Sequence, residues 1–147
     1  MATLTITLTE AVTLGDGSTD RGTTNVQTVT VDEVDHRIMD VGTSFTDIIK
    51  FASANSAGTF ADDTVKYLRI TNLDSSNFIS LRLRTSSLEY FVKVEPEDHF
   101  ILGNNMMDAE TGAGFGTAHS FANIDAISAK ADTAGVQIEY FVASTSS

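Results

Sequence analysis

Residues 3–9 alternate between threonine and large aliphatic side chains. Leu4, Ile6 and Leu8 occupy one parity, and threonine occupies positions 3, 5, 7 and 9. Because successive side chains of a β-strand point to opposite faces, this period predicts a strand with one buried face. Residues 14–25 follow, rich in glycine, asparagine, aspartate and threonine, and this composition favours a loop.

A second strand region extends from Val26 to Val41, and its apolar parity changes at Asp32 and Glu33. A parity change inside one strand-like run predicts a β-bulge or a bend at those residues. Residues 45–52 are compatible with a short strand or a helical turn, and we favour the strand. We expect residues 53–64 to form a loop.

Three strand patterns follow, joined by short polar separators. They cover residues 65–73, 78–85 and 88–94. Separators this short favour consecutive antiparallel hairpins, so we expect a meander. Beyond Pro96, further strands are predicted over residues 99–102, 124–131 and 136–143, with an extended loop over residues 104–123.

These patterns give eight or nine short strands, no amphipathic helix of convincing length, and frequent turn signals. Together they predict an all-β fold, an antiparallel β-sandwich or jelly roll. A chain of 147 residues without an internal repeat or a linker indicates one domain, residues 1–147.

Composition narrows the partners and the chemistry. The net charge of −11 makes most of the surface repel phosphate backbones and anionic lipids, so we expect neither nucleic acid nor a membrane as a partner. No apolar run approaches the roughly 18 residues of a membrane span, and no basic segment precedes an apolar one as in a secretion signal. Cysteine is absent, which excludes disulfides and thiolate metal sites.

The predicted meander places charged side chains on one parity. They are Arg69, Arg82, Arg84, Glu89 and Lys93. If the three strands are neighbours, these residues form a basic stripe on an acidic protein. Two interpretations stay open: a solvated face whose arginines pair with nearby carboxylates, or a docking face for an acidic partner, since arginine binds carboxylates in a bidentate way.

Residues 32–36 gather three carboxylates and a histidine, which raises the question of a metal or acid–base site. Strand alternation would place Glu33 and Asp35 on one face and Asp32 and His36 on the other, and the spacing of a calcium loop is missing. A zinc site would need the three histidines to meet by tertiary coincidence. We therefore expect no metal.

The segment over residues 112–116 is rich in glycine but lacks the spacing and the strand-to-helix context of a phosphate-binding loop. We expect a surface loop here, and Phe115 and Phe121 are candidates for insertion between neighbouring subunits. No nucleophile elbow occurs, and paired catalytic carboxylates cannot be picked from the sequence. We assign no catalytic residue and no cofactor, and expect a protein that is not an enzyme.

Three segments of the sequence, Val65–Asp74, Phe91–Pro96 and Val136–Ala143, resemble the strand sequences of small virion proteins of tailed bacteriophages. These are compact β-domains found as capsid decoration, or cement, proteins and in related head and tail parts. The resemblance covers roughly residues 65–145 and consists of similar strand sequences joined by polar turns. It implies a structural protein that is made in the host cytoplasm, binds the major capsid protein or another virion protein on the capsid surface, and bridges capsid subunits, often as a homotrimer.

The resemblance transfers no binding motif onto particular positions. The candidate contacts come from the residues themselves: Arg69, Arg82, Arg84, Lys93, the threonine-rich first strand, and the 104–121 loop, which includes Phe115 and Phe121. Three alternatives remain: a carbohydrate- or receptor-binding head or tail module, a tail or connector component, and a β-sandwich hydrolase or lyase. An aromatic content of 8% without tryptophan counts against glycan binding.

Overall fold

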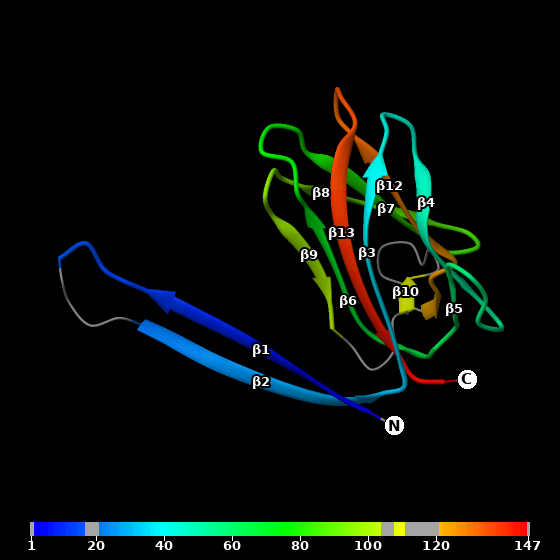
Figure 1. Cartoon of the computed structure of the whole chain (residues 1–147), viewed down its shortest axis with the longest axis horizontal. Helices are drawn as coiled ribbons and strands as arrows, with labels where there is room; N and C mark the ends of the chain where they lie inside the picture. Colours follow the sequence, from blue (N-terminus) through cyan, green and yellow to red (C-terminus); the bar gives the residue numbers. More distant parts are fainter. Residues whose placement is uncertain (1, 17–20, 104–107, 111–120, 147) are drawn as a thin grey trace, which may run out of the picture.

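The computed structural model of the protein describes residues 2–16, 21–103, 108–110 and 121–146. All regular elements in these ranges are β-strands, which form a sandwich and a long two-stranded arm (Figure 1). In chain order they are β1 (Ala2–Val12), β2 (Arg21–Val31), β3 (Glu33–Val41), β4 (Thr46–Ala52), β5 (Thr59–Ala61), β6 (Val65–Asn72), β7 (Ile79–Arg84), β8 (Glu89–Val94), β9 (His99–Leu102), β10 (Asp108–Glu110), β11 (Phe121–Asn123), β12 (Ala126–Ala131) and β13 (Val136–Ser144).

Two sheets build the sandwich. One has the order β5-β4-β12-β7-β8 and the other β3-β13-β6-β9. Neighbouring strands are antiparallel except β4 and β5, which are parallel. The inner faces share one core of fully buried aliphatic side chains, among them Ile49, Leu68, Ile70, Ile79, Leu81, Ile127, Ile138 and Val142. The predicted all-β antiparallel sandwich is confirmed.

Period-two patterning explains how this core forms. Along β7, Ile79, Leu81 and Leu83 are buried, and the residues between them are partly exposed. Each fully buried aliphatic side chain stabilises the fold by about 1.5–3 kcal/mol. The alternation therefore fixes which face of β7 turns inward.

The predicted meander is wrong in one connection. β7 and β8 form the expected hairpin, but β6 belongs to the other sheet. The reason lies at the end of β6, where the Asn72 side chain is fully buried and its amide donates hydrogen bonds to the carbonyl oxygens of Asn77 (2.8 Å), Glu95 (3.1 Å) and Val94 (3.4 Å). These bonds hold a crossing between the sheets where the sequence suggests a tight hairpin.

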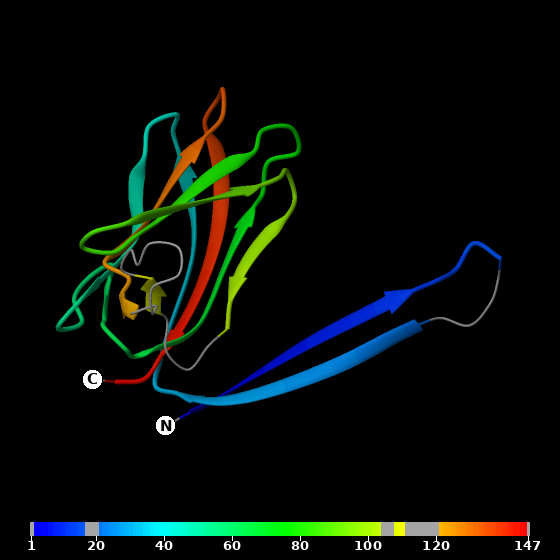
Figure 2. The ribbon, with the colours of Figure 1, turned by 180° about the vertical axis from the view of Figure 1, so that it is seen from behind.

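The arm is a hairpin of β1 and β2 with an unbroken antiparallel register from Ala2 opposite Val31 to Val12 opposite Arg21. The predicted loop over residues 14–25 is therefore wrong from Arg21 onward. Gly22, which falls in that predicted loop, lies inside β2 opposite Ala11. The position needs a glycine, because a Cβ there would stand 2.4 Å from the carbonyl oxygen of Glu10. Seen from behind, the arm again extends well beyond the sandwich (Figure 2).

The chain changes sheets at Asp32. β2 pairs only with β1, whereas β3 pairs with β13, so the predicted bend between Val31 and Glu33 is confirmed. The described residues contain thirteen strands, compared with the eight or nine predicted. The difference comes from this split and from the short strands β5, β10 and β11, the last two of which lie in the predicted 104–123 loop.

Only the base of the arm packs on the sandwich. There, Val29 and Val31 are buried against Tyr67 and Ala143 in a second, smaller apolar cluster, to which Leu4, Ile6 and Phe141 contribute partly buried side chains. Tyr67, Phe141 and Ala143 lie on the parity of β6 and β13 opposite to the main core. The arm base therefore covers part of the outer face of the four-stranded sheet.

Candidate docking surface

The register of the five-stranded sheet places basic side chains together on its outer face. Residues paired directly across an antiparallel ladder share a face. The three rows on the outer face are Lys130–Ser80–Lys93, Asp47–Ser128–Arg82–Phe91 and Lys50–Ala126–Arg84–Glu89. We call this surface, with Lys50, Arg82, Arg84, Lys93 and Lys130, the basic face.

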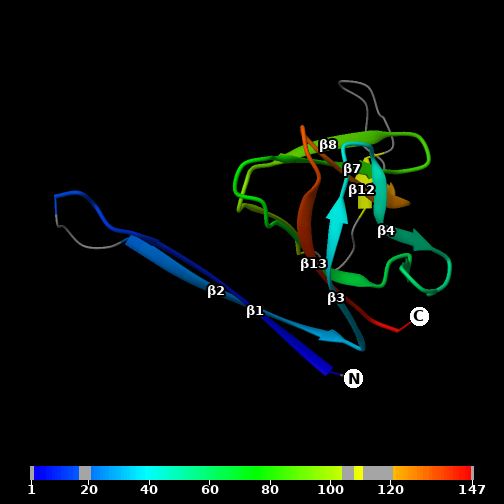
Figure 3. The same ribbon diagram turned by 45° about the horizontal axis from the view of Figure 1, so that its top comes forward.

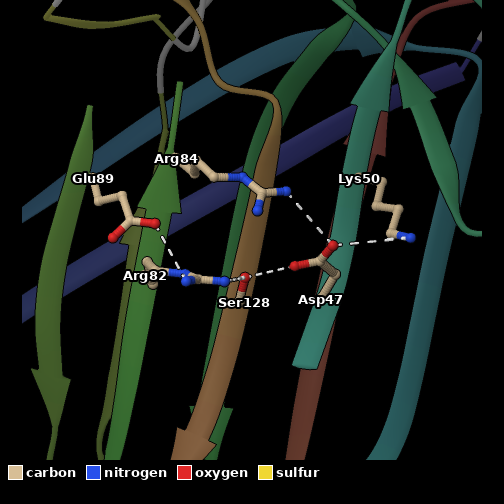
Figure 4. Close-up of polar contacts among 6 residues, drawn as sticks. All are labelled: Asp47, Lys50, Arg82, Arg84, Glu89 and Ser128. Carbon is tan, nitrogen blue, oxygen red and sulfur yellow. Dashed lines mark hydrogen bonds and ion pairs between the residues drawn. The ribbon is translucent and has the colours of Figure 1, made fainter. Parts of the chain in front are cut away.

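Arg82 lies at the centre of a polar network on the basic face (Figure 4). Its Nη1 donates to Glu89 Oε1 at 3.2 Å and its Nη2 to Ser128 Oγ at 3.2 Å, while Ser128 Oγ donates to Asp47 Oδ1 at 2.6 Å. Asp47 Oδ2 also lies 3.7 Å from Arg84 Nη2 and 3.9 Å from Lys50 Nζ. Ser128 is fully buried, so its hydroxyl orders charged neighbours and is not exposed as a nucleophile.

Aromatic rings stand among the basic groups. The Arg82 guanidinium lies 4.8 Å from the centre of the Phe45 ring and Lys130 Nζ lies 5.8 Å from it. The Phe91 ring packs at 5.8 Å from that of Phe45 and is 53% exposed. An aromatic ring attracts a cation placed over its face without neutralising the positive charge. The surface therefore combines positive charge with apolar area.

Charge on the basic face is opposite in sign to that of the whole chain. The three rows hold five of the nine lysines and arginines and two of the twenty carboxylates, and Glu95, just beyond them, pairs with Lys93 Nζ at 2.6 Å; the whole chain carries a net charge of −11. Its ion pairs are partly exposed, and such pairs contribute only about 0–1 kcal/mol each. A bound partner can therefore replace them at little cost.

Three of the predicted contact residues, Arg82, Arg84 and Lys93, meet on the basic face. Arg69 does not, because β6 lies in the other sheet; it forms an ion pair with Glu139 and donates to Thr71 Oγ1 at 2.8 Å. Phe115 lies outside the described residues. Phe121 is the first residue of β11, and its side chain also lies outside the described part.

Sequence reasoning missed Phe45, Lys50 and Lys130. Each lies in or beside a predicted strand, but strand patterns do not tell which strands are neighbours. Only the placement of β12 between β4 and β7 brings these side chains to Arg82. The missing signal was therefore sheet order.

The acidic cluster at residues 32–36 is dispersed by strand alternation. Asp35 accepts hydrogen bonds from Arg37 Nε and from the Tyr140 hydroxyl, both at 3.0 Å, whereas His36 Nε2 lies 3.3 Å from Glu139 Oε2 on the other face. Burial, followed by the bond to Asp35, raises the pKa of Tyr140 to about 12. Within the described ranges, no three histidine or carboxylate side chains are placed to hold a metal ion.

Asp32, Glu33 and Asp35 line one open pocket together with Arg37 and Asn55. Glu33 accepts a hydrogen bond from Asn55 Nδ2 at 3.1 Å, and Asp32 accepts bonds from the Ser146 backbone N–H at 3.1 Å and its hydroxyl at 2.9 Å. His99 begins the edge strand β9, and His119 lies outside the described residues. The two described histidines, His36 and His99, therefore lie on different strands, β3 and β9.

Glu139 joins His36 and Arg69 on the outer face of the four-stranded sheet. Burial acts to raise the pKa of Glu139, but hydrogen bonds from His36 and Arg69 outweigh it and hold the pKa below its ordinary value. This three-residue cluster links β3, β13 and β6. Its effect is on the stability of that sheet.

No helix in the described residues has the length and apolar character that a membrane crossing requires. Comparisons of the chain with protein-family models, with curated proteins and with solved structures give no match.

Proposed function

We propose that this protein is a non-enzymatic structural subunit that attaches through the basic face to an acidic surface of a larger assembly, as a capsid decoration protein attaches to a bacteriophage head. The observation that carries the proposal is the gathering of five basic side chains and the rings of Phe45 and Phe91 on one face of a chain with a net charge of −11. The partner is the major capsid protein or another virion protein, bound on the capsid surface.

The chemistry of the basic face supports a protein partner. Arginine is enriched at protein interfaces together with aromatic side chains, and its planar guanidinium pairs with carboxylates. Arg84 Nη2 lies 3.7 Å from Asp47 Oδ2, and Phe91 is exposed beside Arg82. Both groups gain contacts when an acidic surface with an apolar centre covers them.

Repetition of the partner strengthens the attachment. A shell presents many identical subunits, and an oligomer of this chain, which the bacteriophage resemblance implies to be a trimer, would engage several at once. Linked contacts raise the effective concentration of each remaining contact, so modest single affinities give durable binding. Bridging neighbouring subunits in this way stabilises the shell.

The test is binding of the purified protein to bacteriophage heads assembled without it. We expect binding to weaken as salt is raised from about 0.05 to 0.5 M, because screening shortens the reach of exposed charges to a few ångströms. The double variant Arg84→Glu, Lys93→Glu removes binding. The matched control Lys66→Glu, Arg37→Glu makes the same change in net charge on β6 and β3 of the other sheet. Binding that responds to neither salt nor the first variant refutes the proposal.

A further inference from the structure

Beyond its base, the arm has apolar side chains that nothing in the described part of the chain covers. Leu8 and Val12 are both 52% exposed and Val26 is 57% exposed. A two-stranded hairpin alone is at best marginally stable in water. The outer half of this one extends away from the sandwich in all three views (Figures 1, 2 and 3), so it lacks the packing that normally stabilises a hairpin.

A groove of about 250 Å³ opens where the arm leaves the sandwich. Its lining residues come from the arm, from β6 and from the end of β9: Ile6, Thr7, Leu8, Asn25, Gln27, Tyr67, Ile101 and Gly103. β9 is the last strand of its sheet. Its outer backbone groups therefore have no partner strand among the described residues, and a free sheet edge accepts an added strand.

The distribution of charged residues indicates that a second copy of the chain can bind the arm and the groove. β1 and β2 contain one acidic and one basic residue, Glu10 and Arg21, the segment that joins them contains Asp16 and Asp20, and every residue lining the groove is uncharged. The rest of the chain carries the other −9 of the net charge of −11. Two copies therefore repel one another where their acidic surfaces approach, and the strands of the arm and the uncharged groove can meet without that cost.

We propose that the arm of one copy docks in the groove of a second copy, placing Val12 against Ile101 and the edge of β9. Each copy has one arm and one groove, so reciprocal exchange between two copies or a ring of three closes the assembly. The contact uses the outer face of the four-stranded sheet and its arm. It therefore stands independently of the basic face.

The test is sedimentation of the full chain across a concentration series, with one variant on each side of the contact. We expect the wild type to form a dimer or a trimer. Val12→Asp on the arm and Ile101→Asp in the groove each weaken self-association about 30-fold or more, the equivalent of one buried aliphatic side chain. An equimolar mixture of the two variants recovers one intact contact per mixed pair, between the arm of Ile101→Asp and the groove of Val12→Asp. It therefore associates more strongly than either variant alone but less strongly than the wild type, whose contacts close the assembly.

Leu88→Asp is the matched control, since Leu88 is 39% exposed, as Ile101 is 40% exposed, but lies beside β8 of the other sheet. It leaves association unchanged. Circular dichroism melting of every variant checks that the sandwich is folded, which is expected because the changed side chains lie outside the main core. A wild type that stays monomeric at about 100 μM, association equal in wild type and both variants, or a mixture that fails to recover would each overturn the proposal.

Discussion

The Asn72 side chain is buried at the crossing between the two sheets, beside Asp74, whose Oδ1 accepts hydrogen bonds from the backbone N–H groups of Ser76 and Asn77. The Asn72 amide hydrogens serve three backbone carbonyl groups, at distances of 2.8, 3.1 and 3.4 Å, and the Asn72 Oδ1 accepts a hydrogen bond from the backbone N–H of Asp74 at 3.1 Å. Asn72→Ala removes all of these bonds and leaves several backbone groups without a partner. At about 1–3 kcal/mol for a buried group left unsatisfied, and with part of the loss offset by water entering at the turn, we expect a loss of about 2–4 kcal/mol.

The assay is urea unfolding, followed by circular dichroism, with the free energy of unfolding taken from the midpoint and slope. Gln137→Ala is the control, because this exposed amide makes one side-chain hydrogen bond, to Asp40 Oδ1 at 3.1 Å. We expect the control to lie within about 0.5 kcal/mol of the wild type. If Asn72→Ala is no more destabilising than Gln137→Ala, the buried amide does not hold the crossing and the explanation of the sheet change is wrong.

Three further changes test other parts of the fold. Gly22→Val places a side chain where a Cβ already approaches the Glu10 carbonyl oxygen to 2.4 Å, so amide exchange should speed up in the arm while the unfolding midpoint of the sandwich stays the same. Glu139 has a lowered pKa, so its stabilising contribution is present above the ordinary pKa and is lost as pH falls through the folded value; the stability difference between wild type and Glu139→Gln should therefore shrink on acidification, measured by melting between about pH 3 and 7. Tyr140 has a pKa raised to about 12, so its contribution is present below the ordinary pKa and is lost as pH rises; Tyr140→Phe should remove the last step of an ultraviolet phenolate titration near that pH.

Local alternation was sufficient to predict most strands. Ile79, Leu81 and Leu83 identify β7 and its buried face, and the parity change at Asp32 marks the point where the chain leaves the arm for the sandwich. Each of these signals depends only on neighbouring residues, because the pleat sorts side chains within one strand.

The long-range arrangement was not predictable in the same way. Gly22 lies among residues typical of a turn, yet it is in the tenth of the eleven pairs of the β1–β2 ladder and approaches the Glu10 carbonyl oxygen closely. No short sequence pattern reveals that ladder. Asn72 reads as the polar end of a strand, yet its burial directs the chain into the opposite sheet. In both cases the deciding contact joins residues distant in sequence, and sheet order follows from such contacts.

The two proposed contacts use opposite sides of the sandwich. The arm base packs on Tyr67 and Phe141, on the outer face of the four-stranded sheet, whereas the basic face is the outer surface of the five-stranded sheet. One copy can therefore hold a neighbouring copy and an underlying acidic surface at the same time. Joining copies through the arm multiplies the basic faces presented to a repeating partner, and each added face makes release of the whole less frequent. Self-association through the arm and attachment through the basic face therefore do not compete for the same surface, and their contributions to binding add.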